Sequence, residues 1–179
     1  MNFFGGYMKK LLSIAIEHYS LISLIATFIS FAYMFFFLNK PALNAFLLSF
    51  LTWGVGVRCL VAFAANWVPP FSDQIAEAYG WPLGSSFQRE IASADAAFGL
   101  LGILCNWFAG EFWTATLFGV SCYWFLSELK GLLTIRKRQR DPTYSVKSSL
   151  HAGMGIDFVS SIVIFFCLII RYFNVDFSF

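Results

Sequence analysis

The chain has 179 residues, of which 59% are hydrophobic and 12% are charged, and its formal net charge is +2. A soluble domain is usually about half apolar and a quarter charged, so one soluble core would leave much of this apolar surface unburied. The low counts of Pro, Gly and Cys (5, 13 and 4) exclude disordered, collagen-like and disulfide-rich secreted proteins, and the small net charge argues against a nucleic-acid partner. We predict an all-α fold, a polytopic bundle of membrane helices in which residues 1–179 form a single unit in the lipid bilayer.

The N-terminal segment begins like a signal peptide, with Lys9 and Lys10 before an apolar run at 11–16. Glu17 and His18 interrupt that run and no small-x-small cleavage site follows, which favours an uncleaved first helix. One helix over 11–38 would be about 42 Å long at 1.5 Å per residue, so its first turns should protrude into the headgroups or bend into the interface. A bundle of four spans plus an interfacial first helix is the alternative to five spans.

Five apolar stretches are each long enough to cross roughly 30 Å of hydrocarbon, which takes about 20 residues. They are separated by Asn39-Lys40-Pro41, by Pro69-Pro70, where a helix cannot continue, and by the short turn Ala109-Gly110-Glu111. The predicted spans are 19–38, 42–67, 87–108, 112–135 and 153–172.

The linker between the second and third spans predicts a short interfacial helix. Phe71, Ile75 and Tyr79 recur at helical spacing, with acidic residues between them. Ser85 or Ser86 is the expected N-cap of the third span.

The distribution of Lys and Arg predicts the orientation. Basic residues near span ends are retained on the cytoplasmic side, and a cytoplasmic N-terminus places eight of them inside against two outside. We therefore predict that the N-terminus is cytoplasmic and the C-terminus is outside. The outer residues are Lys40 and Arg171, and the inner ones are Lys9, Lys10, Arg89, Arg136, Lys137, Arg138, Arg140 and Lys147.

Ionisable residues inside the spans are the main functional signal. Each costs about 2.5–3.5 kcal/mol near the bilayer centre, so it usually faces a partner or a cavity. Counted from the cytoplasmic span ends at 1.5 Å per residue, four of them lie roughly 6–13 Å deep and Glu90 lies at roughly 5 Å. Lys130, two residues from Glu128, is expected to reach the headgroups instead. The candidate binding cluster consists of Arg58, Glu90, Asp95, Glu128 and Asp157.

Helical spacing places small and polar residues on the same faces as these charges, which suits close contact between helices. The predicted inward stripes are Asp95 with Gly99, Gly102 and Asn106; Arg58 with Gly54, Ala62 and Ala65; Glu128 with Ser121 and Thr114; Asp157 with Gly153, Ser160 and Ser161; and, on the first span, Ser20, Ser23, Thr27 and Ser30.

The deep set contains one cation, Arg58, and three acids. Such an excess of negative charge cannot stay fully ionised in a dry bundle, so carboxyls are protonated, or water reaches them, or a cation sits among them. The alternative is that Arg58 pairs with one acid as a packing contact while the others bond to neighbouring Ser or backbone groups. A metal site of Asp157, Glu128 and His151 is a further alternative, although their spacing specifies no metal. The cofactor is therefore unknown.

Residues 80–90, Gly-Trp-Pro-Leu-Gly-Ser-Ser-Phe-Gln-Arg-Glu, and the Phe-Gly-Leu-Leu-Gly run at 98–102 resemble a family of small bacterial integral membrane proteins of unknown function. That family has Pro followed by Phe-Gln, a Glu one turn into the helix, Gly-x-x-Gly, a later Gly-His pair and an Asp that opens the last span. Glu90 and Asp157 match its acids, whereas the Gly-His pair is missing here. The resemblance, over 80–172, implies a multi-pass protein of the bacterial inner (plasma) membrane with a polar site and names no reaction.

Three functions remain open from the residues. The first is a channel- or transporter-like protein in which Asp95, Glu128 and Asp157 bind a cation or proton beside Arg58; a chain this short would then work as a homo-oligomer. The second is a membrane-embedded enzyme that uses Glu90 or Asp157 as acid or base on a lipid-soluble substrate. The third is a non-catalytic accessory subunit of a membrane complex.

Overall fold

The computed structural model of the chain describes residues 18–79, 81–138 and 148–175, and every regular element in these ranges is a helix. The all-α fold is therefore confirmed for the described residues. The apolar run at 11–16, its flanking Lys9, Lys10 and Glu17, and the inner-side residues Arg140 and Lys147 lie outside them. The helices are α2 (Tyr19–Phe36), α3 (Ala42–Ser49), η1 (Phe50–Val57), α4 (Arg58–Trp67), α5 (Phe71–Tyr79), α6 (Ser86–Leu104), α7 (Glu111–Arg138) and α8 (Ser148–Val175).

The breaks between helices lie where turn residues predict them. After α2 ends, Asn39 takes a left-handed backbone conformation (φ 49°), and Pro41 caps the next helix. Gly110 has φ 69° in the short turn before α7, a conformation that costs glycine little. The predicted short helix is present as α5, while its position in the membrane interface stays a prediction. The Ser85 hydroxyl caps α6 by accepting a hydrogen bond from the Gln88 backbone N–H at 3.3 Å.

Three helices in the described residues are long and apolar enough to cross a membrane: Tyr19–Phe36, Ala42–Trp67 and Gly155–Phe173. The second combines α3, η1 and α4 into one continuous rod. Helices α6 and α7 occupy the other two predicted spans but are less apolar. Helix α6, for example, carries the charged residues Arg89, Glu90 and Asp95. The membrane character of the chain is thus supported, while the count of five spans stays a prediction.

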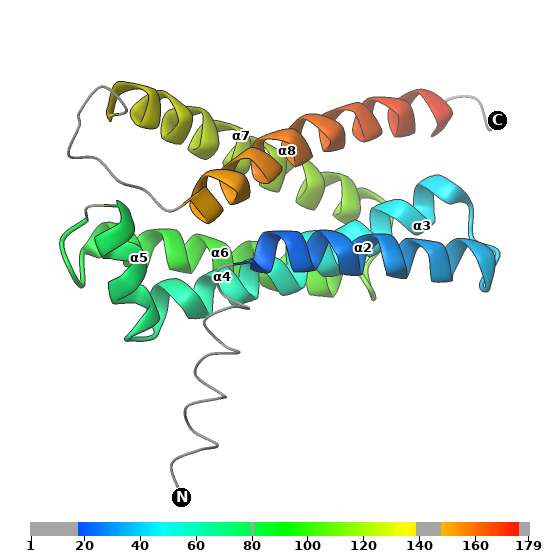
Figure 1. Cartoon of the computed structure of the whole chain (residues 1–179). Coiled ribbons are helices and arrows are strands. Elements are labelled where there is room, and N and C mark those ends of the chain that lie inside the picture. The colour runs from blue at the N-terminus through cyan, green and yellow to red at the C-terminus, as the bar shows by residue number, and fades with distance from the viewer. Residues whose placement is uncertain (1–17, 80, 139–147, 176–179) are drawn as a thin grey trace, which may run out of the picture.

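The long helices form two groups (Figure 1). Helix α2, the α3–η1–α4 rod and α6 run side by side, with α2 and α6 both packed on the rod. Helices α7 and α8 pack on each other and cross over that first group. Consecutive long helices run back and forth along the long axis of the molecule, as the alternating spans predict.

A single apolar core joins the two groups. Leu51 and Val55 of η1 are fully buried together with Leu117 and Val120 of α7 and the nearly buried Ile164 of α8. In contrast, the outward faces of α2 and α8 expose large apolar side chains. Such faces are typical of helices in contact with lipid.

The rod and α6 approach each other through glycine. A Cβ atom at Gly102 would lie 2.5 Å from the Gly56 nitrogen, and one at Gly99 would lie 3.0 Å from the Leu60 nitrogen. The predicted small-residue face of α6 is therefore a close helix contact, and it buries Asp95 at the same time. Asn106, predicted to extend this stripe, lies beyond the end of α6, where its side chain is exposed and bonds to the Thr52 hydroxyl at 3.0 Å.

Candidate functional site

The site is built around Arg58, the first residue of α4, which is only 4% exposed. The eight residues before it form the π-helical segment η1, whose wider turns rotate the following side chains relative to an ordinary α-helix. Short π-helical stretches often occur at functional positions. Because Gly56 lies in this segment, η1 can pack closely on Ile103 of α6 while it orients Arg58.

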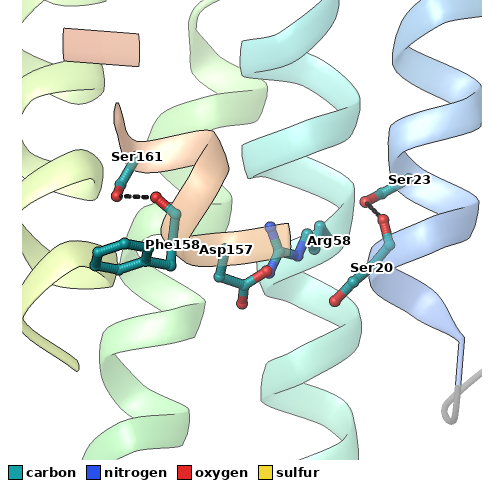
Figure 2. Close-up of polar contacts among 6 residues, drawn as sticks. All are labelled: Ser20, Ser23, Arg58, Asp157, Phe158 and Ser161. Atoms are coloured by element: carbon teal, nitrogen blue, oxygen red, sulfur yellow. Dashed lines mark hydrogen bonds and ion pairs between the residues drawn. The ribbon is translucent and has the colours of Figure 1, made fainter. Parts of the chain in front are cut away.

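Arg58 forms an ion pair with Asp157 of α8, and Asp157 is only 8% exposed. Figure 2 shows the guanidinium and the carboxylate pointing at each other from α4 and α8, with Ser20 of α2 drawn on the opposite side of Arg58 from Asp157. The pairing of Arg58 with one acid, which the packing alternative required, is therefore present. It joins the rod of the first helix group to the α7–α8 pair.

Two aromatic rings complete the surroundings of Arg58. Its Cζ lies 4.4 Å from the ring centroid of Trp124 on α7 and 5.9 Å from that of Tyr19 on α2. A guanidinium over an aromatic face gains cation–π attraction, which is stronger where water is excluded. Arg58 is thus held by side chains from three other helices.

We expect Trp124 to stabilise the bundle partly through Arg58. The Trp124→Leu change keeps an apolar side chain at this buried position but removes the ring face, so part of its cost should depend on the guanidinium. A double-mutant cycle with Arg58→Met, measured as free energy of unfolding in detergent, should give a coupling energy of about 0.5–2 kcal/mol. Additive effects would contradict a specific contribution of the cation–π contact.

Two further acids lie near this pair. Asp95, on the buried face of α6, is 7% exposed and interacts electrostatically with Arg58. The half-buried Glu128 of α7 interacts with both Arg58 and Asp95. The Glu128 Oε2 atom is buried without a hydrogen-bond partner. The structure therefore brings together four of the predicted site residues, one from each of α4, α6, α7 and α8.

Tyr123 packs against the apolar core and also lies near these acids. Its ring stacks on Phe98 with the ring centroids 5.1 Å apart, and its hydroxyl is close enough to Asp95 and Glu128 to interact with both electrostatically. Tyr123 directly precedes Trp124 in the sequence. Helix α7 therefore places the Tyr123 ring near the acids and the Trp124 ring against Arg58. Neither ring was predicted as part of the site.

Glu90 is not brought to this cluster. It is exposed on α6, and five residues separate it from Asp95, which turns it about 140° around the helix. The prediction included it as an ionisable residue within a span and as a match to the family's acid, without considering which side of the helix it faces.

The remaining candidates are only partly described. Five of them lie in α7 or α8 at positions whose side chains the structure does not describe. They are Lys130, Arg136, Lys137, Arg138 and His151. The metal alternative with His151 cannot be placed for this reason. Within the described residues, no group of three His, Cys, Asp or Glu side chains is arranged to hold a metal ion.

The comparison with protein families adds one finding. Residues 17–174 match the model of a family of unknown function, DUF6790. The chain belongs to this family. The resemblance to an uncharacterised family, predicted from residues 80–172, is thereby confirmed, and the DUF6790 match begins well before that region. No curated protein and no solved structure matches this DUF6790 chain. All residues of the Arg58 cluster lie within the matched range.

Trp124 is the site residue that the sequence could have revealed. It lies four residues before Glu128, so both share one face of α7, but only Glu128, Ser121 and Thr114 were considered on that face. Tyr19, at the first turn of α2, gave no comparable signal, because nothing in the spacing relates it to Arg58.

Proposed function

We propose that the chain is a five-span membrane bundle that binds a proton or a small cation at Asp95 and Glu128, in a channel- or transporter-like role. The positive-inside bias supports a cytoplasmic N-terminus, and the resemblance supports the bacterial inner membrane. The cofactor stays unknown.

The balance of charge around Arg58 supports this proposal. One guanidinium and one carboxylate, Asp157, neutralise each other in the ion pair. Asp95 and Glu128 then remain as two acids close to each other with no second cation beside them among the described residues. A buried carboxylate without a partner is costly, so a proton or a bound cation is the means of neutralising the remaining charge.

The unpartnered Glu128 Oε2 atom is the single observation that carries this proposal. Buried polar atoms are nearly always satisfied, and each exception calls for a specific explanation. An oxygen that is buried next to a second acid is a suitable acceptor for a proton or a ligand for a cation.

The enzyme alternative is less well supported. It assigned acid or base chemistry to Glu90 or Asp157, but Asp157 is bound to Arg58 and Glu90 lies on the exposed face of α6. The accessory-subunit alternative explains the ion pair but not the two additional acids. We therefore retain cation or proton binding as the proposed function.

The first test is flux through the purified protein in liposomes loaded with a pH-sensitive dye. With a potassium diffusion potential set by valinomycin, we expect proton entry that falls about tenfold or more in Asp95→Asn and Glu128→Gln, since a tenfold change corresponds to about 1.4 kcal/mol at the site. Sodium and potassium fluxes measured in matched vesicles without valinomycin distinguish a metal cation from a proton.

The matched controls are Asp73→Asn and Glu77→Gln, which make the same chemical changes on α5, away from the cluster. They should retain wild-type flux. A wild-type protein that carries neither protons nor cations, but turns over an added lipid, would overturn the proposal in favour of the enzyme.

Carbodiimide labelling tests binding without requiring transport. Carbodiimides attack protonated carboxyls in apolar surroundings, so Asp95 or Glu128 should be labelled and the ion-paired Asp157 should not. Mass spectrometry identifies the labelled residue, and protection by sodium or potassium would identify a cation as the ligand. Equal labelling of Asp157 would contradict the assigned roles.

A further inference from the structure

Helix α6 has a second face that the site does not use. Its buried face packs on the η1–α4 rod, whereas an exposed stripe runs along the other side of the helix. The residues of this stripe recur every three or four positions and therefore lie on one line along the helix. They are Ser86, Glu90, Ser93, Ala97, Leu100 and Leu104.

The first part of this stripe, from Ser86 to Ala97, does not have the large apolar side chains of a lipid-facing surface. An acid within a spanning helix is costly when it faces acyl chains, and Glu90 is exposed here. Ser93 and Ala97 are small, in contrast to the Phe, Leu and Ile side chains that α2 and α8 expose. Small residues at this spacing allow the backbone of another helix to approach closely.

The charges on either side of the stripe complement each other across a two-fold axis. Arg89 and Glu90 are both exposed, and among the described residues neither forms an ion pair within the chain. Because Arg89 and Glu90 are consecutive residues, their side chains are turned about 100° from each other around the helix axis. They therefore lie on opposite sides of the line through Ser93 and Ala97. When two such helices pack in parallel around a two-fold axis, the residue on one flank faces the opposite flank of the partner, as the e and g positions of coiled coils do.

From this arrangement we infer that the exposed stripe of α6 binds a second copy of this chain, with Arg89 of each copy paired with Glu90 of the other. A closed two-fold dimer in a membrane has its axis along the membrane normal, which makes the two α6 helices parallel. The contact pairs the two exposed charges, which lie near the predicted cytoplasmic end of α6. Helix α6 has one polar face with Asp95 and another with Glu90. In the dimer neither face contacts acyl chains, which explains how α6 remains in the bilayer.

The inference rests on the membrane-spanning placement of α6 in the proposed function, and it is independent of cation binding at Asp95. Loss of flux with intact dimers would count against the proposed function alone, and flux from monomers would count against the dimer alone.

Disulfide cross-linking in membranes tests the contact. In a chain whose four native cysteines are replaced by alanine, we expect Ser93→Cys and Ala97→Cys to form covalent dimers on oxidation. Phe28→Cys on α2 and Val159→Cys on α8 are matched controls, because both positions are exposed on other helices. Dimers at neither Ser93 nor Ala97, or equal cross-linking at the controls, would overturn the inference.

A charge exchange tests the pairing itself. In the Ala97→Cys chain, Arg89→Glu and Glu90→Arg should each lower the dimer association constant roughly fivefold, which is about 1 kcal/mol. The double exchange should restore it, because the opposite charges then face each other again. Failure of the double exchange to recover cross-linking, in protein that elutes from gel filtration as the parent does, would contradict the Arg89–Glu90 contact.

Discussion

The Arg58→Met variant is expected to lose about 3–5 kcal/mol of folding free energy, because the change leaves the Asp157 carboxylate buried without a cation. Asp157 is 8% exposed, so water cannot readily replace the guanidinium. The same change removes the cation–π contacts with Trp124 and Tyr19. Denaturation with sodium dodecyl sulfate in mixed micelles, followed by circular dichroism, measures the loss.

Two further variants separate the ion pair from general damage to the fold. Lys40→Met also removes a basic residue, but Lys40 is exposed in a turn, so its effect should stay within about 0.5 kcal/mol. The double change Arg58→Met with Asp157→Leu removes both charges and should recover much of the lost stability, since apolar pairs often replace buried ion pairs without loss. A double variant as unstable as Arg58→Met would show that the pair is not the main contribution of Arg58.

The elements of the fold were largely predictable because apolar length and turn residues set them. Pro41, Pro69 and Gly110 ended or started helices where expected, and the spacing of Phe71 and Ile75 correctly indicated α5. The π-helical form of η1 was not predictable. Its hydrogen bonds skip one residue further than those of an α-helix, and no apolar spacing or turn residue in 50–57 indicates this rare form.

The candidate site was predictable in part, for a geometric reason. Depth along a helix follows directly from residue number, which is why Arg58, Asp95, Glu128 and Asp157 were predicted at a similar level, and the structure brings these four side chains together. Which way a side chain faces depends on rotation about the helix axis, and Glu90 was assigned without it. The choice of Asp157 as the partner of Arg58 requires knowing which helices are adjacent, and one sequence does not contain that information.

Gly102→Ala is expected to destabilise the bundle by about 1–3 kcal/mol or more, the usual cost of adding volume to a tightly packed contact. The new Cβ would lie 2.5 Å from the Gly56 nitrogen and 2.6 Å from the Leu51 carbonyl oxygen. Both are backbone atoms, so no side chain can rotate away, and η1 and α6 have to separate. Thermal unfolding of the purified protein in detergent measures the change.

Gly155→Ala provides the matched comparison, since no neighbouring atom lies within 4 Å of a Cβ built at that position in α8. It should be neutral, or stabilising by up to about 1 kcal/mol, because alanine favours helices more than glycine does. The two variants make the same chemical change and differ only in the space around it.

Gly102→Ala should also lower proton or cation flux, because Gly56 lies two residues before Arg58 and any displacement of η1 moves the guanidinium away from Asp157. Wild-type stability in Gly102→Ala would mean that the rod and α6 are not in close contact, and Asp95 would then lack the packing that holds it beside Arg58.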